Sequence, residues 1–149
     1  WGQFDSDRMY AIAKKADPGR LYDATSGWFA EKDSDFDSVH IYFGPKKPVK
    51  KNRPVFLSEF GGYSYLVEEH VFSMKNYGYG TCRSEEELWK RIHDRYTELV
   101  LPYVYLPKGL CGSVYTQLSD VEDEINGLYT YDRKVCKVDK KKMKHLAKI

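Results

Sequence analysis

One acidic residue at the end of a short apolar run is the main candidate for chemistry in this sequence. Residues 55–57 are apolar, and Glu59 follows them directly before a Phe-Gly-Gly turn signal. This pattern is typical of a buried strand that ends where it delivers a charged side chain to a site. A carboxylate inside a covered parallel sheet would be costly, so we expect Glu59 at the mouth of a polar cleft. The alternative is a solvent-facing Glu without a role.

Three further runs have the composition of strands, and each carries polar or aromatic side chains. These runs are residues 21–25, 38–43 and 111–118. In a (β/α)8 barrel the working residues come from the carboxyl ends of the strands, where the loops meet above a packed core. We therefore expect one pocket ringed by Asp23, Thr25, His40, Tyr42, Glu59, Gln117 and Asp120.

An acid surrounded by aromatic rings favours glycoside hydrolysis over proteolysis or phosphoryl transfer. Aromatic residues make up 15% of the chain, with 13 tyrosines and 3 tryptophans. Flat, half-polar rings of this kind suit sugars or protein surfaces. The sequence has no HExxH, no GxSxG and no glycine-rich phosphate loop, and no Ser–His set stands out. We expect no cofactor and no metal.

Helices between the strands should position these groups. Ser84 and Glu87 form a capping box before an apolar stripe, which predicts a helix over residues 84–99. Apolar residues at three- and four-residue steps predict a short helix over residues 9–16 that faces the core. Strands that alternate with helices and connections predict an α/β fold with parallel pairing.

Length and charge limit the classes of partner. With 149 residues the chain matches one domain, and 24 Lys and Arg nearly balance 22 Asp and Glu. This balance favours neither nucleic acid nor a membrane surface as partner. Residues 137–149 hold six lysines, which predicts an amphipathic helix with its charged face in water. The alternative, a nucleic-acid patch, lacks interleaved stacking aromatics.

The three cysteines and the chain's first residues bear on its location. Cys82, Cys111 and Cys136 are widely spaced and odd in number, which indicates free thiols in a reducing compartment, so we expect a cytoplasmic protein. No apolar run approaches the roughly 18 residues of a membrane span. The chain begins at Trp1 and not at Met, and we interpret it as a piece of a longer protein.

Several separated motifs carry a family resemblance. They are Ala-Thr-Ser-Gly-Trp at 24–28, Val-His-Ile-Tyr-Phe-Gly at 39–44, Ser-Glu-Phe-Gly-Gly at 58–62, Tyr-Thr-Gln-Leu-Ser-Asp at 115–120, Glu-Ile-Asn-Gly-Leu at 124–128 and Tyr-Asp-Arg at 131–133. In this order they resemble glycoside hydrolase family 2, the β-galactosidase and β-glucuronidase group. The resemblance covers essentially the whole chain.

The resemblance implies a fold and a missing partner for Glu59. Residues 1–149 would be the C-terminal half of a catalytic (β/α)8 TIM barrel, strands five to eight, without strands one to four and the family's β-sandwich domains. The general acid/base of the family would be a Glu immediately upstream of Trp1, so this chain alone is expected to be inactive. Exposed strand edges at 21–25 and 111–118 would favour a homo-oligomer.

The resemblance also implies roles for individual residues. Glu59 would be the nucleophile of a retaining β-glycosidase that acts by double displacement on terminal β-linked sugars. Tyr42 would donate the hydrogen bond that holds this carboxylate as an anion. The residues implied to contact the carbohydrate substrate are Asp23, Trp28, His40, Gln117 and Asp120. Strand eight has Tyr-Thr-Gln where glucuronidase-like members carry a tryptophan, so the sugar stays open.

Two other functions remain open from the sequence. A carbohydrate-binding or interaction module would keep the aromatic cleft without catalysis. A basic-tailed nucleic-acid module would bind through the tail lysines in a salt-dependent manner.

Overall fold

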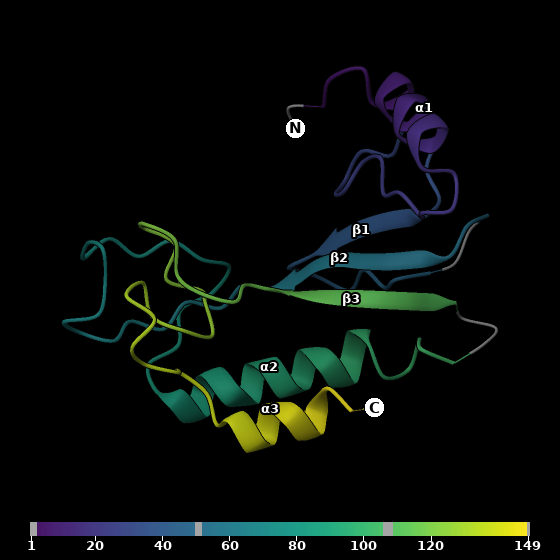
Figure 1. Cartoon of the computed structure of the whole chain (residues 1–149). Helices are drawn as coiled ribbons and strands as arrows, with labels where there is room; N and C mark the ends of the chain where they lie inside the picture. Colours follow the sequence, from purple (N-terminus) through teal and green to yellow (C-terminus); the bar gives the residue numbers. More distant parts are fainter. Residues whose placement is uncertain (1–2, 50–51, 106–108, 149) are drawn as a thin grey trace.

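Three parallel strands form the sheet of this protein, with β2 (Val55–Gly61) between β1 (Asp37–Ile41) and β3 (Leu110–Thr116). The computed structural model describes residues 3–49, 52–105 and 109–148. Three helices complete the described fold: α1 (Ser6–Ala16), α2 (Glu85–Leu99) and α3 (Lys140–Leu146). The carboxyl ends of the strands face the long loops that follow β2 and β3 (Figure 1).

The central strand carries the core because one of its faces is covered by α2. Val55, Leu57 and Phe60 have no exposed surface and pack with Leu99 and Val100 of the second helix region. In Figure 1, α2 and α3 both lie on the same side of the sheet. Burial of each of these apolar side chains stabilises the folded state by roughly 1.5–3 kcal/mol. The resulting core holds β2 in place, so the position of its carboxyl end is defined.

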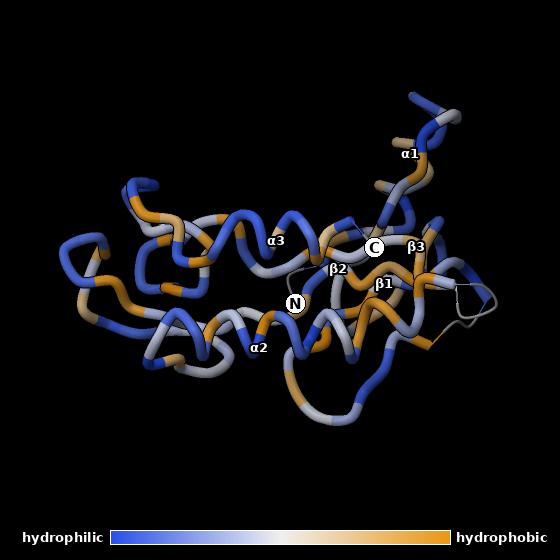
Figure 2. Tube along the Cα trace, turned by 90° about the horizontal axis from the view of Figure 1, so that it is seen from below, coloured by the Kyte–Doolittle hydropathy of each residue, from blue (hydrophilic) through white to orange (hydrophobic). Residues whose placement is uncertain are grey.

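The helix predicted over residues 84–99 is confirmed by α2. The Ser84 hydroxyl accepts the Glu87 N–H at 3.1 Å, which is the first hydrogen bond of the predicted capping box, while the Glu87 carboxylate accepts the N–H of Arg83, the residue before the cap, at 2.9 Å. Leu88, Ile92 and Leu99 are buried. Figure 2 shows the resulting alternation of polar and apolar residues along α2, with α3 beside it.

Helix α1 confirms the prediction of a helix but not the prediction that it faces the core. None of its residues is buried, and Met9 and Ile12 are about half exposed. In Figure 2 α1 extends away from the layer formed by α2 and α3. The helix is held mainly through Asp35: the Tyr10 hydroxyl donates to this carboxylate at 3.1 Å, and Lys14 forms an ion pair with it at 2.9 Å.

The tail helix is shorter than its prediction. Asp139 accepts the N–H groups of Lys141 and Lys142, and α3 begins directly after this cap. Leu146 is buried, which agrees with an amphipathic helix. Lys137, however, lies before the helix and is fully buried, so the prediction that this lysine belongs to a charged face in water is wrong.

The prediction of a half TIM barrel with strands five to eight is also wrong. The described residues form a three-stranded sheet, and residues 21–25 are not a strand. The reason is local: the N–H of Tyr22 donates to the Asp35 carboxylate at 2.6 Å, and the N–H of Ala24 donates to the Ser34 hydroxyl at 3.3 Å. Side chains of a nearby turn therefore take the backbone donors that a fourth strand would have used.

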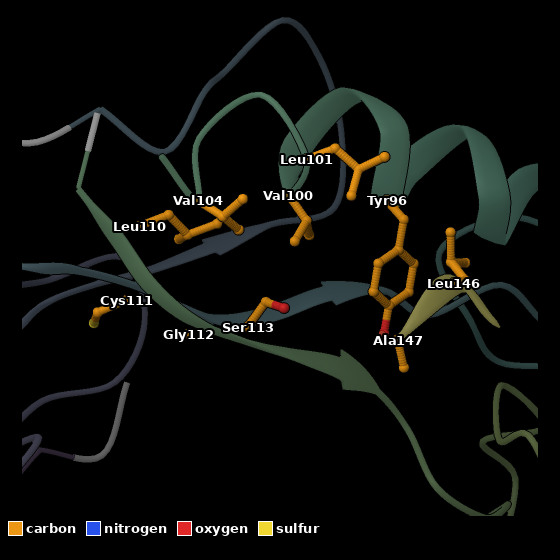
Figure 3. A pocket seen from close by; sticks show the side chains of 10 residues that line it. All are labelled: Tyr96, Val100, Leu101, Val104, Leu110, Cys111, Gly112, Ser113, Leu146 and Ala147. Atoms are coloured by element: carbon orange, nitrogen blue, oxygen red, sulfur yellow. The ribbon is translucent and has the colours of Figure 1, made fainter. Parts of the chain in front are cut away.

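A cavity of about 450 Å³ lies between α2, β3 and the end of α3. Figure 3 shows its apolar lining, which includes Val100, Val104 and Leu110, with Tyr96 on one side. Among the described residues of this lining there is no carboxylate, lysine or histidine. No helix within the described residues is long and apolar enough to cross a membrane.

Candidate active site

Glu59 lies at the carboxyl end of the central strand, where the pairing of β1 with β2 becomes irregular. Val39 is opposite Leu57, but the next residue of β1, His40, is opposite Glu59. The extra residue on β2 is Ser58, so the strand is bulged at this point. Bulges re-aim side chains and are common next to active sites. The side chain of Glu59 retains 40% exposure, which agrees with its predicted place at a mouth.

Tyr42 directly contacts this carboxylate. Its hydroxyl donates a hydrogen bond to Oε2 of Glu59, and Oγ1 of Thr116 lies 3.4 Å from the same hydroxyl. The Tyr42 ring stacks on Tyr79 with centroids 3.6 Å apart. Burial, together with the neighbouring carboxylate, raises the pKa of Tyr42 well above its ordinary value of 10.0. The phenol is therefore neutral and acts as a donor throughout the physiological range.

His40 contacts two partners through its two ring nitrogens. Nδ1 lies 3.4 Å from Oε2 of Glu59, and Nε2 lies 2.9 Å from the hydroxyl of Ser26. Burial lowers the pKa of His40 below its ordinary value of 6.5, although Glu59 and Asp23 oppose this shift. The imidazole is therefore neutral at pH 7 and carries one proton, whose position depends on these partners.

The segment before β1 wraps around His40. The indole N–H of Trp28 donates to the His40 carbonyl at 3.1 Å, while the ring itself remains 53% exposed. Gly27 has a φ of 124°, and a Cβ at this position would stand 3.4 Å from Cε1 of His40. A residue without a side chain lets the chain approach the imidazole closely in a conformation that other residues rarely adopt.

These side chains line one cavity of about 420 Å³. Within the described lining Glu59 is the one carboxylate, and aromatic rings form much of the wall. The residues that line the cavity are Ser26, Gly27, Trp28, His40, Tyr42, Glu59, Tyr77 and Tyr79. Four of the predicted site residues, Trp28, His40, Tyr42 and Glu59, thus come together.

Arg95 of helix α2 holds the backbone of Tyr42 and the side chain of Tyr63, next to the cavity. Arg95 donates to the Tyr42 carbonyl at 3.2 Å and to the Tyr63 hydroxyl at 2.8 Å. Its third partner is Glu98 of the same helix, at 3.3 Å. The guanidinium has donors in a fixed fork, so it ties the end of β1 to the loop after β2. This contact limits how far the Tyr42 ring can move from Glu59.

Two predicted substrate contacts lie outside the cavity lining. Asp23 accepts the Ser38 hydroxyl at 2.8 Å, and Ser38 in turn bonds to Ser58 at 2.7 Å on the sheet. Gln117 uses its amide to bond to Glu124 at 3.1 Å and Asn126 at 2.6 Å. Both side chains order loops and strands next to the cavity.

Asp120, the third predicted substrate contact outside the cavity lining, is completely buried in the protein. Its carboxylate has no exposed surface, lies 2.7 Å from the Nζ of Lys137, and accepts the Gly127 N–H at 2.8 Å. Lys137 also donates to the carbonyls of Tyr65 and Ile125. The pair joins three loop segments and does not face the cavity, so its contacts are those of a structural anchor.

The sequence assigned no role to five residues that the structure brings to the site: Ser26, Gly27, Tyr77, Tyr79 and Thr116. Ser26 and Thr116 stood in the family motifs without a role, while Tyr77 and Tyr79 belong to the long aromatic loop after β2. The length and aromatic content of that loop were the available signal, because structureless loops of this length usually carry function. Loop length and aromatic content do not indicate which tyrosine ring of the loop lies near Glu59.

No protein-family model matches the chain, and a search of curated proteins gives no match either. No group of three or more His, Cys, Asp or Glu side chains in the described part of the chain is arranged to hold a metal ion. What the geometry offers chemically is an accessible carboxylate with a neutral phenol donor, a neutral imidazole and a hydroxyl, all in one aromatic cavity.

Proposed function

We propose that this chain carries the nucleophile of a retaining β-glycosidase, with Glu59 in that role. The observation that carries the proposal is the hydrogen bond from the Tyr42 hydroxyl to the Glu59 carboxylate inside an aromatic cavity. A carboxylate that attacks an anomeric carbon must be ionised, held in one orientation and partly accessible. Glu59 is oriented by Tyr42 and remains 40% exposed.

The reaction would proceed in two displacements. A Glu59 oxygen attacks the anomeric carbon, the bond to the leaving group breaks, and a covalent glycosyl-enzyme forms. Water then attacks the same carbon and releases Glu59 as a carboxylate. The Tyr42 hydroxyl donates to the free carboxylate before and after these steps and so returns it to the attacking position.

The walls of the cavity suit a sugar ring. Trp28 and Tyr77 are each about half exposed, and the indole of Trp28 is fixed by its bond to the His40 carbonyl. Rigid aromatic rings with one exposed face offer contact area at little cost in conformational entropy. Terminal β-linked sugars of small size would fit a cavity of about 420 Å³.

A retaining mechanism also needs a second carboxyl group, about 5–5.5 Å from the nucleophile. Glu59 is the one carboxylate among the described residues of the lining. The resemblance to glycoside hydrolase family 2 assigns the general acid to a Glu immediately upstream of Trp1. A sharp test of Glu59 therefore uses substrates whose leaving group departs without protonation.

The test is covalent trapping of the nucleophile. The chain is incubated with 2-deoxy-2-fluoro-β-glycosyl fluorides of the gluco, galacto, manno and glucurono series, and its intact mass is measured. We expect one fluoroglycosyl adduct with one of these sugars, and peptide mapping should locate it on Glu59. The variant Glu59→Gln should form no adduct, while the control Glu31→Gln, an exposed carboxylate outside the lining, should react as the wild type does.

A second candidate is a carbohydrate-binding module, favoured by the single carboxylate of the described lining. In that case the same sugars would bind without forming an adduct. Titration of the Trp28 fluorescence with each free sugar distinguishes the two functions. Binding that Trp28→Ala abolishes, together with a complete absence of adduct, would contradict the glycosidase proposal and support the binding module.

A further inference from the structure

The contacts of His40 connect a hydroxyl on one side to a carboxylate on the other. Ser26 Oγ lies 2.9 Å from Nε2 of His40, and Nδ1 of the same ring lies 3.4 Å from Glu59. A nucleophile within hydrogen-bond reach of a base, with the base oriented by a third group, is the general arrangement of nucleophilic catalysis. The three residues come from the loop before β1, from β1 and from β2.

The acceptor character of Glu59 decides the tautomer of the imidazole. An ionised carboxylate has no proton to donate, so the ring nitrogen beside it is the one that carries the hydrogen. A proton on Nδ1, 3.4 Å from the Glu59 carboxylate, would leave Nε2 to present its lone pair to the Ser26 hydroxyl at 2.9 Å. In this tautomer the hydroxyl donates to the base that would accept its proton.

The hydroxyl is also reachable. Ser26 is exposed and lines the cavity at Glu59, whereas the His40 side chain is 18% exposed. An accessible nucleophile with a sheltered, neutral base is suited to reaction with an electrophile that enters from solvent. The Tyr77 and Tyr79 side chains line the same cavity, and phenol hydroxyls can stabilise a developing oxyanion.

We propose that Ser26, His40 and Glu59 form a catalytic set for acyl transfer, a second activity of the same cavity, and that it takes esters of small acyl groups. Ser26 Oγ attacks the ester carbonyl carbon while its proton passes to Nε2 of His40. The tetrahedral intermediate collapses, the C–O bond of the ester breaks, and the leaving alcohol takes that proton. Water, deprotonated by the same nitrogen, then attacks the acyl carbon; the bond from that carbon to Ser26 Oγ breaks, Ser26 Oγ takes the proton back from Nε2, and the acid is released.

This inference does not depend on the glycosidase proposal, since the reacting atom is Ser26 Oγ and not an oxygen of Glu59. In acyl transfer Glu59 forms no covalent bond, and its Oε2 stays beside Nδ1 of His40 at 3.4 Å. The two activities exclude each other within one turnover, because a glycosylated Glu59 can no longer pair with His40. Fluoroglycosides report on Glu59 and serine-directed probes report on Ser26, so each proposal can fail alone.

The experiment is labelling of the full 149-residue chain with a small alkyl fluorophosphonate, followed by intact-mass analysis and peptide mapping. We expect one adduct, on Ser26, with loss of fluoride. Ser26→Ala should form none, and His40→Gln should react at least about 10²-fold more slowly, the usual contribution of a general base. The rate should fall in acid as His40 becomes protonated, and p-nitrophenyl acetate hydrolysis should follow the same dependence.

Two variants separate this role from a structural one. Ser26→Cys keeps a nucleophile beside Nε2, and peptide mapping after treatment with a thiol-directed acetylating reagent should find one label at position 26 in addition to any on the free cysteines of the wild type, such as the exposed Cys111. Thr97→Ala removes another exposed hydroxyl, which donates to the His93 carbonyl at 2.9 Å, and should change nothing. An adduct elsewhere, no adduct at all, or equal rates for the wild type and His40→Gln would overturn the proposal.

Discussion

Two of the acid–base side-chain pairs in this molecule, Glu59 with His40 and Asp120 with Lys137, differ in their access to water. Glu59 and His40 meet at the open end of the sheet, where the carboxylate side chain is 40% exposed. Asp120 and Lys137 meet among the loops after β3, and both side chains have no exposed surface. The buried pair is surrounded by protein groups, among them the carbonyls of Tyr65 and Ile125 and the N–H of Gly127, while the open carboxylate keeps acceptor capacity for another molecule.

The buried pair stabilises the structure, whereas the partly exposed carboxylate of Glu59 can react with another molecule. Burial raises the pKa of Asp120 and lowers the pKa of Lys137, while each partner opposes the shift of the other. The lysine also ties the carbonyls of Tyr65 and Ile125, so the pair orders several loops at once. A buried pair of this kind costs more when one member is removed than it contributes as a pair.

The largest expected effect is therefore on stability, at the buried pair. Asp120→Asn leaves the ammonium of Lys137 buried without its counter-charge, and we expect a loss of about 3–5 kcal/mol in the free energy of unfolding. Urea denaturation followed by circular dichroism measures it. The double variant Asp120→Asn/Lys137→Met should recover a large part of the loss.

The matched control is Lys134→Met, because the Lys134 side chain is 75% exposed and pairs with Asp132 at 3.6 Å. Its removal should cost less than about 1 kcal/mol. Equal losses for Asp120→Asn and Lys134→Met would remove the contrast between a buried and an exposed pair.

The second largest expected effects on stability are at two tightly packed glycines, one beside the buried pair and one at the end of β2. A Cβ on Gly127, beside the buried pair, would stand 2.2 Å from backbone atoms of Ser119 and Asp120. A Cβ on Gly61, where β2 leaves the sheet, would stand 2.2 Å from the Tyr115 ring at a φ of 86°. We expect Gly61→Ala to cost about 1–3 kcal/mol and Gly127→Ala to cost more, since backbone cannot rotate aside.

Thermal unfolding of these variants tests that order. Gly19→Ala serves as the control, because its Cβ would meet a single side-chain atom at an ordinary distance of 3.7 Å. It should leave stability unchanged or raise it slightly, since alanine restricts the unfolded chain. A Gly127→Ala variant as stable as Gly19→Ala would contradict the packing described here.

At the open site a substitution should affect reactivity more than stability. Tyr42→Phe removes the hydroxyl that donates to Glu59, and we expect fluoroglycoside trapping of Glu59 to slow by about tenfold, or ~1.4 kcal/mol. The control is Tyr10→Phe, which removes a similar phenol–carboxylate bond, to Asp35, on α1. If both variants are trapped at the wild-type rate, Tyr42 does not orient the nucleophile.

The smallest effect concerns pH. Burial lowers the pKa of His40 in the folded chain below its ordinary value of 6.5. Between these two pKa values the unfolded chain binds more protons, so stability rises with pH across this window and is complete above 6.5. His40→Gln should flatten this rise in urea titrations at several pH values, whereas His93→Gln, on the exposed side of α2, should keep it.

Sequence patterns predicted local features well and sheet membership less well. The apolar run before Glu59 became the central strand, and the Ser84 cap became the start of α2. Residues 21–25 had the composition of a strand, but Asp35 and Ser34 took their backbone donors. The composition of residues 21–25 cannot indicate that competition, because the competing side chains stand 10 and 13 positions further along the chain.

The candidate site divides in the same way. The predicted residues Trp28, His40, Tyr42 and Glu59 share the cavity, whereas Asp120 is sealed against Lys137. Asp120 follows a strand and Lys137 lies in a basic tail, so each residue considered by itself is predicted to be exposed. Two opposite charges can both be buried when they contact each other. Asp120 and Lys137 are 17 positions apart in the sequence, so their contact is visible only in the three-dimensional structure.

The sequence by itself determined the Ser84 cap of α2, the apolar strand and the acid near its end, because these depend on neighbours within a few positions. The tertiary structure decided the bulge that sets Glu59 beside His40, the approach of Ser26 to that imidazole and the burial of Lys137. Each of these joins segments that are distant in the chain. Their energies arise from packing and desolvation, which exist only once the segments meet.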